Sequence, residues 1–134
     1  MMRIVLALLM LSGTLLALEW AKDLNTALET AQKDNKALMV FVEGENCTWC
    51  KKMKLRTIGD ESVEKRLENF VLVKVMRENP KAMELLPPIQ GVPTVFFLSE
   101  KKEVLEEVIG YFDVLDFTSY IGDVEKKLNK PKIK

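Results

Sequence analysis

Hydrophobic residues follow two different spacings along the chain, and these spacings divide it into strands and helices. Continuous apolar runs at residues 37–43 (ALMVFVE), 70–76 (FVLVKVM) and 94–98 (TVFFL) predict strands that are buried on both faces of a sheet. A fourth strand, EVLEEVIG, follows the turn SEKK, and we expect it to pair antiparallel with the third.

Apolar residues spaced three and four positions apart predict the helices. The pattern is helical from Glu19 onward, and good helix formers follow Cys47 until TIGD interrupts them. Asp60 and Asp113 are expected N-caps of the helices ESVEKRL and VLDFTSYIGDVEKKL. Pro80 falls in the first turn of a short helix, where its missing N–H costs nothing.

The order of these elements predicts the fold class. Helix, strand, helix, strand and helix alternate first, and a strand hairpin and a covering helix complete the chain. This order is typical of an α/β fold with a central mixed β-sheet flanked by helices on both faces. A chain of 134 residues fits a single domain with a substantial core.

The N-terminal residues read as an export signal. The short positive start MMR precedes IVLALLMLSGTLLAL, an apolar stretch of 15 residues, whereas a membrane-spanning helix needs about 20. We therefore expect a signal peptide at residues 1–18, with a retained N-terminal anchor and a buried first helix as the alternatives. A domain at 19–128 and a basic tail at 129–134 follow. Export would place the protein in the periplasm or another oxidising compartment, where disulfides persist.

Composition and charge exclude several functions. Lys plus Arg equals Asp plus Glu at 20 each, which gives no electrostatic reason to expect nucleic acid or an anionic membrane as a partner. The chain contains no histidine. It therefore lacks the commonest general base, the commonest zinc ligand and any Cys-His nucleophile pair.

The two cysteines of the chain, Cys47 and Cys50, lie in GENCTWCKKM at a predicted strand-to-helix junction. In a helix, positions three apart share a face, close enough for a disulfide after a small adjustment. The helix N-terminus, with Lys51 and Lys52 nearby, should lower the pKa of the Cys47 thiol. Cys50, one turn further in, should keep its proton. We expect Cys47 to be the attacking sulfur and Cys50 the resolving one.

The two cysteines could also bind a metal ion or form a purely structural disulfide. A zinc site wants four ligands, so this chain would have to dimerise to complete one, and we expect no metal. Two sulfurs, together with Met53, suit Cu(I) because it is a soft ion. A structural disulfide is a third alternative, although it would close so short a loop that it restrains the unfolded chain little.

Three segments resemble the thioredoxin superfamily: MVFVEGENCTWCKKM, IQGVPTVFFL and VIGYF. The resemblance covers residues 19–128 and is closest to exported bacterial thioredoxin-like proteins of the SoxW type. It implies a thioredoxin-like fold in which Val92, Pro93 and Thr94 form a cis-proline loop facing the cysteines. In this family, Val92 would offer backbone hydrogen bonds to an extended substrate strand. A cis Val92–Pro93 bond is therefore expected.

The sequence departs from the family pattern at two places. Thr48 and Trp49 replace the Gly-Pro found between the cysteines of cytosolic thioredoxin, and Trp49 is expected either to contact substrate or to pack in the core. Phe41 stands where the family carries a buried aspartate that assists the resolving thiol. Glu43 or Lys51 could substitute for it, although a surface glutamate without a role is the favoured interpretation of Glu43.

The expected function is that of an exported thiol–disulfide oxidoreductase that reduces protein disulfides without a cofactor. The resemblance implies a membrane thiol transporter as the electron donor, and a monomer is the default for this size. The alternative is a binding module of the same fold that holds Cu(I) or a client protein without turnover.

Overall fold

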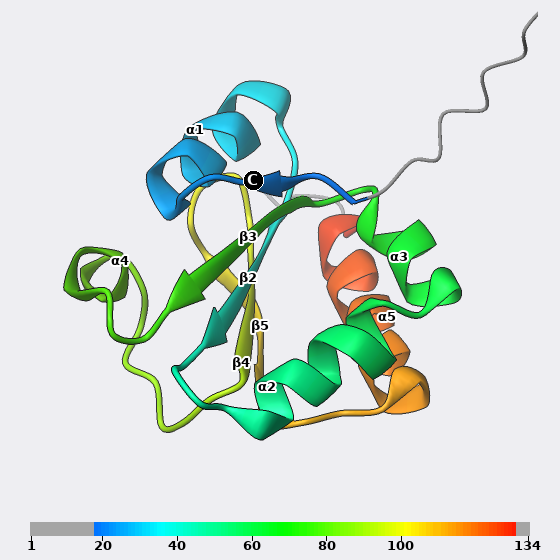
Figure 1. The fold of residues 1–134 in the computed structure, drawn as a ribbon. Coiled ribbons are helices and arrows are strands. Elements are labelled where there is room, and N and C mark those ends of the chain that lie inside the picture. The colour runs from blue at the N-terminus through cyan, green and yellow to red at the C-terminus, as the bar shows by residue number, and fades with distance from the viewer. Residues whose placement is uncertain (1–17, 131–134) are drawn as a thin grey trace, which may run out of the picture.

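Five strands form one sheet in the computed structural model, which describes residues 18–130 (Figure 1). The strands are β1 (Trp20–Ala21), β2 (Leu38–Glu43), β3 (Val71–Met76), β4 (Thr94–Leu98) and β5 (Val104–Ile109). Their order across the sheet is β1-β3-β2-β4-β5. The first three run parallel, and β4 is antiparallel to both β2 and β5. The predicted mixed sheet and its C-terminal hairpin are confirmed.

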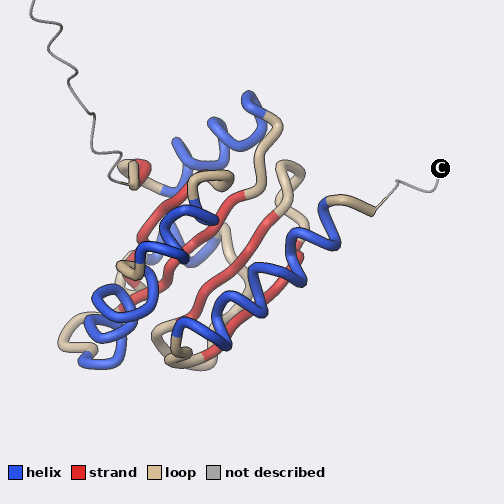
Figure 2. The backbone as a smooth tube through the Cα atoms, turned by 90° about the vertical axis from the view of Figure 1, so that its right-hand side faces the viewer, coloured by secondary structure: helices blue, strands red, loops and turns tan. Residues whose placement is uncertain are grey.

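Helices cover both faces of this sheet. They are α1 (Leu24–Asp34), α2 (Thr48–Met53), α3 (Glu61–Leu67), α4 (Pro80–Glu84) and α5 (Val114–Leu128), with a π-helical turn η1 (Lys54–Ile58) that continues α2. Figure 1 shows α1 and α4 on one side and α2, α3 and α5 on the other, and Figure 2 shows α5 running lengthwise along the strands. Within residues 18–130, no helix is both long and apolar enough to cross a membrane.

The hydrophobic core has two layers because β2 is buried on both faces, as its apolar run predicts. Met39 and Phe41 face the cluster that contains residues of α2, α3 and α5. Val40 and Val42 face the cluster formed with α1 and α4. The central strand is thus fixed from both sides, and its carboxyl end is a rigid base for the segment that follows it.

The predicted helix starts are confirmed at three places. Asp60 accepts hydrogen bonds from the N–H groups at the start of α3, and Asp113 does the same for α5. The Ser62 hydroxyl is the main cause of the lowered pKa of Asp60. Pro80 is the first residue of α4, which Asn79 caps.

The prediction of a helix from Glu19 is wrong at its beginning. Trp20 and Ala21 form β1, which pairs with Leu72 and Val73 of β3, and α1 begins only at Leu24. Asp23 fixes this start, because its side chain accepts a hydrogen bond from the Thr26 N–H. The Trp20 ring also lies under the Lys74 ammonium, 4.6 Å from its centroid.

The expected interruption at TIGD is also wrong in part, because the helix continues through η1 to Ile58. The buried Thr57 stabilises this turn by donating its hydroxyl to the Phe112 carbonyl over 2.6 Å. The turn ends at Gly59, whose N–H donates to the Lys54 carbonyl. A Cβ at Gly59 would lie 2.8 Å from the Leu55 carbonyl oxygen, so this close approach requires glycine.

Replacing Gly59 with alanine is expected to lower the free energy of unfolding by about 1–3 kcal/mol, because backbone atoms must shift to admit the methyl group. Urea denaturation would measure the loss. Gly122→Ala in α5 is the matched control, since its Cβ would lie 3.6 Å from the nearest atom, an ordinary contact. In a helix interior, this control should gain about 0.5–1 kcal/mol. Equal stabilities of the two variants would contradict the proposed steric role.

Candidate active site

Cys47 and Cys50 are joined by a disulfide at the start of α2, with their Cα atoms 5.2 Å apart. Cys47 is the N-cap of this helix: its backbone is extended, and its Sγ accepts the Cys50 N–H at 3.1 Å. Four residues separate β2 from α2: Gly44, Glu45 and Asn46 form the connecting turn, and Cys47 is the cap. The Cys50 N–H, in the first helical turn, therefore points toward the Cys47 sulfur.

The two sulfurs differ in their access to solvent. Cys50 is 1% exposed and belongs to the core cluster that contains Phe41 and Met53. Cys47 packs against that cluster but is partly exposed. An external thiol can therefore reach Cys47 and not Cys50.

The loop before β4 lies beside the segment that carries the disulfide. The Val92–Pro93 peptide bond is cis, and Pro93 is buried. Thr94, also buried, donates its hydroxyl to the Gly91 carbonyl at 2.7 Å, which closes the loop on itself. A Cβ on Gly44 would lie 3.2 Å from Val92 Cγ2, so Val92 borders the turn that leads to Cys47.

Trp49 is exposed and packs on a third loop rather than in the core. Its side chain is 54% exposed, and its ring centroid lies 5.3 Å from that of Tyr111. The Lys52 ammonium lies 4.4 Å from the centroid of the Trp49 ring. Tyr111 follows Gly110, whose N–H donates to the Pro93 carbonyl at 2.8 Å. This hydrogen bond connects the loop of Tyr111 to the cis-proline loop.

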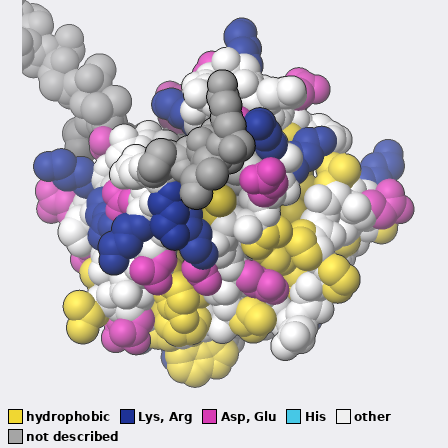
Figure 3. Space-filling model, turned by 180° about the vertical axis from the view of Figure 1, so that it is seen from behind, with side chains coloured by type: hydrophobic (Ala, Val, Ile, Leu, Met, Phe, Trp, Pro, Cys, Tyr) yellow, Lys and Arg dark blue, Asp and Glu magenta, His cyan; other side chains and the backbone are white. Residues whose placement is uncertain are grey.

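These contacts place an aromatic pair next to the disulfide. Figure 3 shows hydrophobic side chains exposed at the lower end of the molecule, where Figure 1 places the beginning of α2. Tyr111 was missed from the sequence because VIGYF indicated a family resemblance but no partner for its tyrosine. Lys51, by contrast, is exposed, and its backbone N–H donates to the Cys47 carbonyl at 3.2 Å.

Glu43 is not the free surface glutamate that the sequence favoured. Its side chain is 14% exposed, and its Oε1 lies 2.6 Å from the Lys54 ammonium. Glu43 is two residues beyond Phe41 on the same face of β2, the face that packs on α2. Lys54 lies one helical turn after Cys50, since its N–H donates to the Cys50 carbonyl. An ion pair therefore borders the buried cysteine, while fully buried Phe41 packs in the same cluster.

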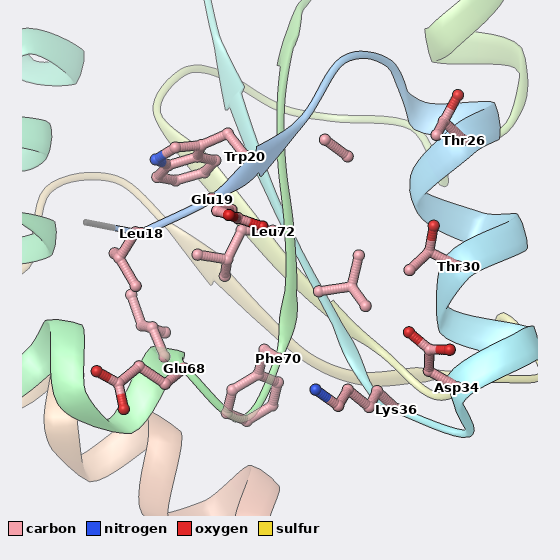
Figure 4. Close-up of a pocket in the computed structure, with 13 residues that line it drawn as sticks. Leu18, Glu19, Trp20, Thr26, Thr30, Asp34, Lys36, Glu68, Phe70 and Leu72 are labelled. Atoms are coloured by element: carbon pink, nitrogen blue, oxygen red, sulfur yellow. The ribbon is translucent and has the colours of Figure 1, made fainter. Parts of the chain in front are cut away.

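A cavity of about 510 Å³ lies apart from the cysteines, at the β1 edge of the sheet (Figure 4). Thr26, Thr30 and Asp34 of α1 line it on one side, and Trp20 and Leu72 border it from the strands. Neither cysteine contributes to its wall. Among residues 18–130, no three His, Cys, Asp or Glu side chains gather so that they could hold a metal ion.

Comparison with known families decides the relationship. The profile of a family described as thioredoxin-like matches residues 19–99, which include both cysteines and the loop at Pro93. This chain belongs to that family. Its α/β fold is the thioredoxin-like fold, and the disulfide at the start of α2 indicates redox activity.

The thioredoxin-like chain is similar to several characterised proteins. It is 28% identical to anterior gradient protein 3 of Mus musculus over 69% of this chain and 56% of that protein. It is 31% identical to the thiol:disulfide interchange protein DsbD of Vibrio cholerae over 60% of this chain and 14% of that protein. A thioredoxin from Thermus thermophilus superposes with a TM-score of 0.73 at 28% identity, covering 84% of this chain and 90% of that one.

The chain spans little more than half of the first of these relatives and a small part of DsbD. The family match establishes the thioredoxin-like fold.

Proposed function

We propose that this protein is an exported thiol–disulfide oxidoreductase that reduces protein disulfides through Cys47 and Cys50. The observation that carries the proposal is the disulfide at the first turn of α2, with one sulfur accessible and the other 1% exposed. A purely structural bridge needs no such difference in access. Similarity to part of DsbD, a thiol:disulfide interchange protein, supports the same chemistry.

The reaction begins from the reduced form. Cys47 thiolate, stabilised by the N–H groups of the first turn of α2, attacks one sulfur of a substrate disulfide. A mixed disulfide forms, and the other substrate sulfur leaves as a thiolate that takes a proton from water. Cys50 then loses its proton to solvent and attacks the Cys47 sulfur, which forms the Cys47–Cys50 disulfide and breaks the mixed disulfide. The second substrate sulfur leaves as a thiolate and takes a proton from water. The substrate is released as a dithiol, and two electrons have passed to it from the two cysteines.

The substrate-binding residues in this proposal surround the accessible sulfur. Val92 offers backbone groups to an extended substrate segment, and Pro93 and Thr94 shape the loop that presents them. Trp49, exposed and packed on Tyr111, offers an apolar surface to the same substrate. Lys51 adds positive charge near Cys47.

The cellular setting extends the proposal further. The apolar segment within residues 1–18, which lies almost wholly outside the described residues, supports export to the periplasm. A monomer of the SoxW type, recharged by a membrane thiol transporter, fits this setting. The chain resembles part of DsbD, whose name is thiol:disulfide interchange protein. This name is consistent with a thiol transporter as the electron donor.

Replacing Cys50 with serine is expected to trap substrates, because the mixed disulfide on Cys47 can no longer be resolved. The variant, expressed as the full-length protein, would be isolated under non-reducing conditions and its partners identified by mass spectrometry. Exported proteins should be released from it by dithiothreitol. The matched control is the double variant Cys47→Ser, Cys50→Ser, which should trap none. Recovery of the same proteins with both variants, or of none with either, would contradict the proposed function.

A further inference from the structure

Arg77 lies directly beside the turn that leads to the disulfide. It follows the last residue of β3, and its N–H donates to the Glu43 carbonyl at 2.8 Å, which extends the ladder between β2 and β3 by one step. The Arg77 side chain lies against Gly44. Cys47 follows three residues later. The carboxyl ends of β2 and β3 therefore bring a cation to the edge of the sheet from which α2 begins.

The Arg77 side chain contacts this turn where it faces the cis-proline loop. A Cβ on Gly44 would lie 3.0 Å from Arg77 Nε, 3.4 Å from Arg77 Cζ and 3.2 Å from Val92 Cγ2. The guanidinium and Val92 thus meet over Gly44, which is buried beneath them. Even so, 48% of the Arg77 side chain is exposed. The cation is held at a fixed place and is still open to solvent.

Glu78 orients this arginine without using all of its hydrogen-bonding capacity. Glu78 Oε1 accepts the Glu45 N–H at 3.0 Å and lies 3.5 Å from Arg77 Nε. The bond from the Glu45 N–H is the main cause of the lowered pKa of Glu78, so this carboxylate is committed to the turn. A guanidinium has five N–H donors in a planar fork. Among the described residues, Arg77 forms a single ion pair, which joins its Nε to Oε1 of Glu78.

We propose that Arg77 selects substrates by binding a carboxylate on the polypeptide that docks between Cys47 and Val92. The partner is therefore a protein whose disulfide cysteine has an acidic residue close by in its sequence. A fork of N–H donors fits a carboxylate in a bidentate manner, which a lysine at this place could not do. Lys52 packs on the Trp49 ring, Lys54 pairs with Glu43, and Lys51 is exposed on α2. Arg77 is distinguished from them by its place beside Val92 at Gly44. The inference rests on the proposed function and names its substrate class.

Kinetics with designed peptides would test this selection. Three disulfide-bonded peptides would differ only in one residue, two positions from the cysteine, which is Glu, Gln or Lys. For the wild-type protein, kcat/KM should be about 3- to 10-fold higher for the Glu peptide than for the Lys peptide, mainly through KM. Arg77→Gln should reduce this ratio to near one, and Arg77→Glu should invert it. Arg56→Gln, which removes an exposed cation of η1, should keep the wild-type ratio.

Two further measurements separate this inference from the proposed function. Raising the salt from about 20 mM to about 200 mM should shrink the Glu-to-Lys ratio, because the contact is partly exposed. Titration of the same peptides with serine in place of cysteine would give Kd values without any redox step. Equal Kd values for the Glu and Lys peptides, or an unchanged ratio in Arg77→Gln, would overturn the selection by Arg77. Loss of all peptide reduction with the Kd preference intact would instead overturn the proposed function alone.

Discussion

Replacing Cys47 with serine is expected to lower the rate of disulfide reduction by roughly 10³-fold or more, the size of effect seen when an enzyme loses its nucleophile. A serine hydroxyl is hardly ionised at neutral pH, whereas a cysteine thiol at a helix N-terminus loses its proton much more readily. Cys50 cannot take over the attack, because it is 1% exposed and belongs to the core beneath α2. Insulin reduction with dithiothreitol as the electron source would measure the loss against the uncatalysed rate.

The two cysteine positions can be compared in one single-turnover experiment. Reduced Cys50→Ser should release up to one equivalent of thiol from a disulfide peptide and then stop, since Cys47 can attack but the adduct cannot be resolved. Cys47→Ser should release none on the same timescale. If Cys47→Ser released a full equivalent and Cys50→Ser released none, the assigned roles of the two sulfurs would be reversed.

Much of the fold could be predicted because local physical signals agree with the tertiary structure. The apolar runs of β2 and β4 correctly predict strands buried on both faces, and Asp60 and Asp113 cap helices in the structure as in the sequence. For β3 the prediction is wrong in part, because Lys74 and Met76 near its end are exposed. The strand β1 could not be found this way. Two residues have no periodicity, and Trp20 is extended only because it pairs with Leu72 of β3.

For a related reason, the continuation of α2 into η1 could not be predicted from the sequence. A π turn differs from an α-helix in which carbonyl each N–H reaches, and no residue spacing reports that choice. What stabilises η1 is the hydroxyl of Thr57 bound to the carbonyl of Phe112, from a loop far along the chain. The local preferences of the threonine and glycine in TIGD predict a turn. The tertiary contact of Thr57 instead lets the helix continue to Ile58.

The candidate site shows the same division between local and distant information. The spacing of Cys47 and Cys50 and their place after a buried strand predicted Cys47 as the attacking sulfur. Its partial exposure, against 1% for Cys50, agrees with that prediction. The neighbours of the pair were not predictable, because Tyr111 follows β5 and contacts Trp49, whereas Arg77 follows β3 and lies against Gly44. The pairing of Glu43 with Lys54 likewise depends on how β2 meets the end of α2.

The second large effect is expected in the core that supports the site. Phe97 is 0% exposed in β4, the strand that follows the cis-proline loop, and it pairs across the sheet with Met39 of β2. Its ring centroid lies 5.5 Å from that of Phe70 and 6.1 Å from that of Phe117. It therefore joins the sheet to α5 and to the segment between α3 and β3.

Replacing Phe97 with alanine is expected to lower the free energy of unfolding by about 3–5 kcal/mol, because a cavity forms where three elements meet. This is a large part of the roughly 5–15 kcal/mol that stabilises a domain. Denaturation in urea with the disulfide kept intact would measure it. Leu115→Ala, at a side chain 78% exposed on α5, should change stability by no more than about 0.5 kcal/mol. Similar small losses in both variants would mean that the aromatic cluster does not hold the sheet against α5.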